Sequence, residues 1–142
     1  MKILTYVERC LYDYKANVAE IEALRSEQNN LMSLHGHNYE MNNSFGECDP
    51  VANIVNQSLN LDKKIAAIEK RVKPVDKLLG DLKGSSQRVQ QMAGILRLRY
   101  FQHEDNFVVR SELSISSTTL WRRSRELLAL ASHYFGKNLK YF

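Results

Sequence analysis

The stretch that decides the fold is Leu113-Ser114-Ile115-Ser116-Ser117-Thr118-Thr119-Leu120-Trp121-Arg122-Arg123. It places a serine suited to a turn and a second serine suited to a helix cap between two segments with helical spacing of apolar residues. We predict a short helix over 107–113, a turn at Ser114, and a last helix that is capped by Ser116 and stopped by Gly136. Two helices joined by so tight a connection form a helix-turn-helix.

The last helix of this pair is predicted to have two distinct faces. A rotation of about 100° per residue places one set of residues toward the core: Leu120, Ser124, Leu127, Ala131 and Tyr134. The opposite side carries Thr118, Arg122 and Arg125, with Trp121 on the flank. Such a face can read base edges in the major groove, because arginine donates two hydrogen bonds to guanine and threonine offers a hydroxyl or a methyl group. The residues we predict to contact double-stranded DNA are Ser116, Ser117, Thr118, Thr119, Trp121, Arg122, Arg123 and Arg125.

Two positions depart from the usual helix-turn-helix pattern. Arg110 stands where a small residue is common, so its side chain must extend into solvent or the helices must splay. Ser114 stands where glycine is common. If the turn requires a positive φ there, serine costs about 1 kcal/mol relative to glycine.

The residues before the motif are predicted to add one more helix. Ser85 or Ser86 is expected to cap a helix that continues to Tyr100-Phe101, and Asp105 to cap the short helix of the motif. These three helices define a predicted DNA-binding domain over residues 85–142.

Residues 1–84 are predicted to form a helical hairpin or a coiled coil. The first helix carries a seam at steps of three and four: Leu4, Val7, Leu11, Tyr14, Val18 and Ile21. The second begins at Asp49-Pro50 and carries a matching stripe: Ile54, Ser58, Leu61, Ile65, Ile68 and Val72. Residues 34–49, rich in Asn, Gly, His and Ser, are predicted to form a loop. The stripes permit either packing within one chain or a homo-oligomer through the same seam, and the predicted fold class is all-α.

A proline is predicted to end the second long helix. Lys73 precedes Pro74, and a residue before proline is pushed out of the α region while proline itself lacks the amide donor. A short amphipathic turn is expected to follow and to end at Gly84.

Charge is distributed unevenly along the chain. Residues 1–49 hold four basic against eight acidic residues, whereas residues 85–142 hold nine basic against four acidic ones, in a chain of net charge +4. This asymmetry is typical of a protein that contacts a polyanion with one end and a protein partner with the other.

Several classes of function find no support in the sequence. No nucleophile with a base, phosphate-binding glycine loop or placeable carboxylate pair is present, so we predict no enzyme and no cofactor. His35, His37 and Cys48 lack zinc-site spacing, so no metal is expected. Two distant cysteines and the lack of long apolar segments predict a cytoplasmic protein without a disulfide or membrane partner.

The C-terminal sequence resembles region 4 of sigma factors. The similarity lies in Arg99-Tyr100-Phe101 and, after a gap, in the serine- and threonine-rich run that ends at Arg122-Arg123. The order of segments, from N-terminal helix and Asn/Gly-rich loop to terminal motif, resembles the RinA and ArpU type of phage late transcription activators. The resemblance implies promoter binding and recruitment of host RNA polymerase, in the cytoplasm of the host cell.

Two alternatives remain open at this point. Small terminase subunits of phages also join a DNA-binding helical unit to a helical hairpin, although they usually place the DNA-binding unit first. The chain could also be a helical interaction protein whose last helix is rich in arginine without any contact to nucleic acid.

Overall fold

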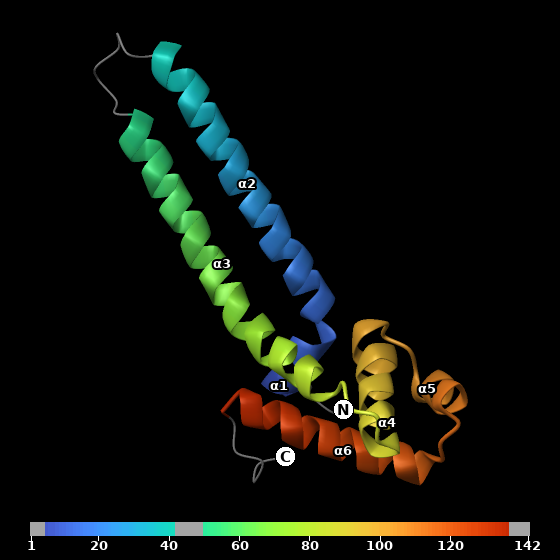
Figure 1. Ribbon diagram of the computed structural model, residues 1–142. Helices are drawn as coiled ribbons and strands as arrows, with labels where there is room; N and C mark the ends of the chain where they lie inside the picture. Colours follow the sequence, from blue (N-terminus) through green and yellow to red (C-terminus); the bar gives the residue numbers. More distant parts are fainter. Residues whose placement is uncertain (1–4, 42–49, 137–142) are drawn as a thin grey trace. The chain divides into compact units, whose positions relative to one another are not determined.

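A computed structural model describes residues 5–41 and 50–136, and the side chains of all of these except 34–41, 50 and 51. Within these ranges all regular structure is helical, which confirms the predicted all-α fold class (Figure 1). The elements are α1 (Tyr6–Tyr12), α2 (Tyr14–Met41), α3 (Pro50–Asp81), α4 (Gln87–Ile95), the π-helix η1 (Leu96–Phe101), α5 (Asn106–Leu113) and α6 (Ser117–Tyr134).

The chain divides into two compact units. The core unit comprises Met1–Ala16 and Arg71–Phe142, and the hairpin unit comprises Asn17–Lys70. This division differs from the predicted boundary between residues 84 and 85. The reason is packing, because Leu11 of α1 and Leu78 of α3 are buried in the same apolar cluster as Leu127 of α6.

Helix starts in the core unit follow the predicted caps. The side chain of Ser86 accepts a hydrogen bond from the backbone N–H of Val89 at 3.2 Å. Asp105 and Ser116 accept equivalent bonds at 2.9 Å and 3.1 Å from backbone N–H groups in the first turns of α5 and α6. Each cap stabilises its helix by about 1 kcal/mol.

Pro74 does not end α3, so the predicted interruption at Lys73-Pro74 is wrong. The helix continues to Asp81, and the buried stripe continues with it through Val75 and Leu78, which are both fully buried. Burial of these side chains outweighs the missing backbone hydrogen bond and the steric cost of an internal proline, which amount to about 3 kcal/mol.

The predicted continuous first helix is interrupted at Asp13, which separates α1 from α2. The carbonyl oxygen of Tyr12 accepts a hydrogen bond from Nε2 of His103 at 2.9 Å, and the two rings stack at 3.8 Å between centroids. A distant side chain therefore satisfies a backbone group that the interruption leaves free. Because His103 is 91 residues further along the chain, this contact cannot be predicted from the local sequence.

In the hairpin unit, α2 and the first part of α3 run antiparallel side by side (Figure 1). Apolar side chains fill the seam between the two helices, and hydrogen bonds between polar side chains join the helices at its edge. Arg25 donates to Glu69 at 2.7 Å, and Nε2 of Gln28 donates to Asp62 at 2.6 Å. Ile65 and Ile68 are buried as their predicted stripe requires.

The predicted loop over 34–49 begins too early, because the backbone of α2 is helical to Met41. Residues 34–41 contain one glycine, which costs about 1 kcal/mol in a helix. That cost is too small to end a helix already nucleated over many turns. Residues 42–49, including Cys48, lie outside the described residues.

Candidate nucleic-acid interface

The connection between α5 and α6 is a tight turn at Ser114, as predicted. Ser114 adopts the left-handed conformation, with φ 53° and ψ 48°, and the backbone N–H of Ile115 donates to the carbonyl of Arg110 at 3.1 Å. Ser114 thus has the positive φ that was considered for this turn from the sequence. Val109 and Leu120 are buried on the two sides of the turn, Leu120 as predicted.

The close approach that sets the first helix of the pair involves Gly94 of α4, which sequence reasoning missed. A Cβ at this position would lie 2.5 Å from Cδ2 of Leu113 at the end of α5. Of the two outcomes expected for Arg110, the structure shows the first, because its side chain is exposed to solvent. A glycine inside a helical run was the available signal for such a close approach.

The two predicted faces of α6 are confirmed by burial. Of the residues expected to face the core, four are buried and Tyr134 is half-buried. On the other side Thr118, Arg122 and Arg125 are exposed, and the ring of Trp121 is 61% exposed. None of these four side chains belongs to the buried apolar cluster of the core unit or packs against it.

Arg123 differs from the other arginines of α6, although it was predicted with them. Its Nε donates to Oε1 of Gln91 on α4 at 2.9 Å, and its Nη1 lies 3.1 Å from Oε1 of Glu126. Glu126 also pairs with Arg88 of α4 at 2.7 Å. This network fixes α6 against α4, so the guanidinium of Arg123 is engaged within the fold.

The hydroxyl groups at the start of α6 also have partners inside the fold. Ser116 accepts from the backbone of Thr119 and donates to its hydroxyl at 3.0 Å. Ser117 and Thr118 are exposed in the first turn. Among the predicted contacts with DNA, the side chains free to reach outward are therefore those of Ser117, Thr118, Trp121, Arg122 and Arg125.

Two arginines on the outward face have different environments. The guanidinium carbon of Arg125 lies 4.9 Å from the centroid of the Trp121 ring, a distance at which the ring attracts the cation. Arg122 makes no ion pair or hydrogen bond with any residue that the structure describes. The Trp121 ring thus orients the guanidinium of Arg125, whereas the guanidinium of Arg122 keeps all its N–H donors for an external acceptor.

Contacts with α1 limit the part of α6 that is free. The ring of Tyr6 packs edge-to-face on Phe135, just beyond the end of α6, with centroids 5.9 Å apart. The exposed residues Thr118, Arg122 and Arg125 lie away from this contact, in the N-terminal half of the helix, which is the half that helix-turn-helix proteins insert into the major groove.

Comparison with known proteins gives no match to a protein family, a characterised protein or a solved structure. No helix in the described ranges is both long enough and apolar enough to cross a membrane. The described side chains also contain no group of three acidic, histidine or cysteine residues that could hold a metal ion. The side chains of His35, His37 and Cys48, where no metal is predicted, lie outside those described.

Proposed function

We propose that the chain binds double-stranded DNA with the N-terminal half of α6 in the major groove and regulates transcription. The observation that carries this proposal is the outward face of α6, where Thr118, Arg122 and Arg125 are exposed on a helix whose other face is fixed in the core. Rigid elements present side chains to bases more reproducibly than loops do.

The charge of this region favours a polyanionic partner. Arg110 of α5 is exposed beside the turn and adds to Arg122 and Arg125 of α6. Positive side chains on both helices of the pair suit a duplex, since the first helix usually crosses the phosphate backbone while the second reads bases.

The finer proposal is a phage or prophage late-gene activator that acts with host RNA polymerase in the host cytoplasm. It is supported by the resemblance of the 99–123 region to sigma region 4. The hairpin unit, which holds no part of the helix-turn-helix, supplies a separate surface for a protein partner or a second copy of the chain.

The experiment is a salt titration of binding to a selected duplex and to random duplex, with wild type, Arg122→Ala and Lys63→Ala. If Arg122 reads a base edge, its loss should cost about 1–3 kcal/mol on the selected duplex and much less on random duplex. Lys63→Ala removes the same charge from an exposed position in the hairpin unit and should bind as wild type does. A folded Arg122→Ala protein that binds both duplexes like wild type would remove α6 as the reading helix.

A further inference from the structure

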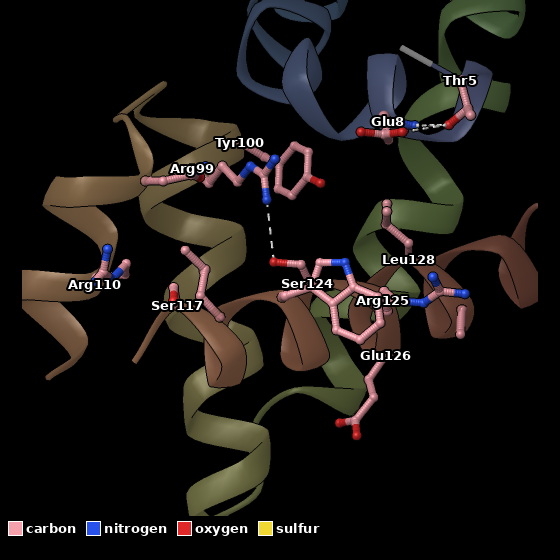
Figure 2. A pocket seen from close by; sticks show the side chains of 14 residues that line it. Thr5, Glu8, Arg99, Tyr100, Arg110, Ser117, Ser124, Arg125, Glu126 and Leu128 are labelled. Carbon is pink, nitrogen blue, oxygen red and sulfur yellow. Dashed lines mark hydrogen bonds between the residues drawn. The ribbon is translucent and has the colours of Figure 1, made fainter. Parts of the chain in front are cut away.

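A cavity of about 810 Å³ lies between α1, η1, α5 and α6 of the core unit (Figure 2). Leu120, Leu128 and Trp121 contribute apolar surface to its walls, and charged groups from α1 and η1 face the same space. An apolar wall with a few converging polar groups is the usual composition of a small-molecule site.

Two of the polar groups come from the π-helix η1. Arg99 and Tyr100 are consecutive residues that both line the cavity, and the backbone N–H of Gln102 donates to the carbonyl of Arg97 at 3.0 Å across the wide turn. π-helical segments are rare, and they are found frequently at functional sites.

Glu8 of α1 brings a carboxylate to the cavity although the residue is only 6% exposed. Its Oε1 accepts a hydrogen bond from the hydroxyl of Thr5 at 3.3 Å. In the described part of the chain no cationic side chain lies within ion-pair distance of it. Burial of a carboxylate without a cation is costly, so a positive group at this place would be favoured.

Arg99 brings the opposite charge. Its Nη1 donates to the hydroxyl of Ser124 at 3.3 Å, and its guanidinium lies 5.6 Å from the centroid of the Tyr100 ring. No carboxylate of the described residues pairs with it, so most of its N–H donors are left for an acceptor in the cavity.

Tyr100 lies between these two charges. The residue is 3% exposed, and its hydroxyl has no hydrogen-bond partner in the described structure. Burial raises the pKa of Tyr100 to about 12, with Arg99 lowering it and Glu8 raising it. Both charges therefore act on the same phenol, which Figure 2 shows directed into the space between α1 and α6.

We propose that this cavity binds a free α-amino acid with an apolar side chain. Its ammonium group would donate to the Glu8 carboxylate, and its carboxylate would accept from Arg99. The apolar side chain would pack on Leu128 and on the ring of Trp121. A zwitterion fits because Glu8 and Arg99 present opposite charges to the same cavity without pairing with each other, while Arg110 and Arg125 add further positive charge to its lining.

The test uses the fluorescence of Trp121, which is the sole tryptophan of the chain and lines the cavity. The full-length protein is titrated with L-phenylalanine, with phenethylamine, which lacks the carboxylate, and with 3-phenylpropanoate, which lacks the ammonium. L-phenylalanine should bind about tenfold or more tightly than either analogue, because each adds only one of the two charged contacts. L-leucine serves as a second amino acid with a smaller side chain.

The variants separate the two charges. Glu8→Gln should abolish the advantage of L-phenylalanine over 3-phenylpropanoate, and Arg99→Gln its advantage over phenethylamine. Arg97→Gln on η1 and Glu112→Gln on α5 make the same substitutions at exposed positions outside the cavity lining and should bind like wild type.

A third variant keeps the test informative if a charge substitution disturbs the fold. Ala129→Leu fills part of the cavity and leaves both charges in place, so it should weaken binding of L-phenylalanine while circular dichroism stays that of wild type. Absence of a fluorescence response to both amino acids at millimolar concentration, or equal affinity for all three phenyl compounds, would overturn the proposal. The titration contains no DNA, so its failure would leave the role proposed for α6 intact.

Discussion

The core unit and the hairpin unit are both helical, but they bury apolar side chains to different degrees. The largest fully buried side chains all belong to the core unit, among them Leu11, Ile95 and Leu127. In the hairpin unit the best-buried apolar side chains, such as Leu61 and Ile68, keep 4–7% exposure in a seam between two helices. Completely buried apolar side chains are thus concentrated in the unit that also carries the candidate interface.

The difference shows what each unit is suited to do. The proposed reading helix would have to hold its side chains in a fixed geometry, and α1 and α4 of the core unit pack against α6. A single pair of helices has few neighbours, and it leaves Met32, Val55 and Leu59 about half exposed. Such surface is available to a partner in a way that the buried core is not.

The largest expected effect tests whether α1 belongs to the core. Leu11→Ala empties a fully buried position and should lower the free energy of unfolding by about 2–5 kcal/mol. Leu61→Ala in the hairpin unit should cost about 2 kcal/mol or less, because a seam open to solvent leaves a smaller closed cavity. Chemical denaturation of both variants measures the difference, and equal losses would remove the distinction between the units.

Local features were predictable from the sequence, whereas features that depend on distant residues were not. The caps at Ser86, Asp105 and Ser116 need only the next three residues, so their prediction was correct. The interruption at Asp13 and the continuation through Pro74 depend on side chains that come from other parts of the chain. At Pro74 the local preference opposes the observed helix and is outweighed by burial of Val75 and Leu78.

The same rule applies to the candidate interface. Helical periodicity correctly separated the outward face of α6 from its core face, because both are properties of one segment. It could not separate Arg123 from Arg122, since the difference is made by Gln91, which is 32 residues earlier in the chain. The cavity near Tyr100 was missed for the same reason, because α1 and η1 meet only in the fold.

Alkaline pH should act on the core unit through Tyr100. Its pKa is raised from 10.0 to about 12, mainly by burial, so the folded state binds the phenolic proton more tightly than the unfolded state does. This contribution is fully present below pH 10 and is lost as the pH rises toward 12. At about 1.4 kcal/mol per pKa unit, the loss amounts to about 3 kcal/mol at most.

Tyr100→Phe removes this titration and leaves the ring in place. At neutral pH the variant should be about as stable as wild type, because the hydroxyl it loses has no hydrogen-bond partner among the described residues. Between pH 10 and 12 its stability should fall less steeply than that of wild type. Urea unfolding at several pH values gives both slopes, and identical slopes would contradict the assignment of the alkaline loss to Tyr100.

The smallest expected effect concerns the turn that joins the two helices of the motif. Ser114 has a φ of 53°, which strains a residue with a side chain but not glycine. Ser114→Gly should therefore stabilise the fold by up to about 1 kcal/mol, offset in part by the greater freedom of glycine in the unfolded chain. DNA affinity should be unchanged, because Ser114 precedes the face proposed to read DNA. Ser111→Gly is the matched control, since Ser111 is equally exposed but lies inside α5, where glycine should destabilise by about 0.5–1 kcal/mol. If thermal unfolding shows both variants to be destabilised alike, the left-handed conformation at Ser114 is not the strained point of the turn.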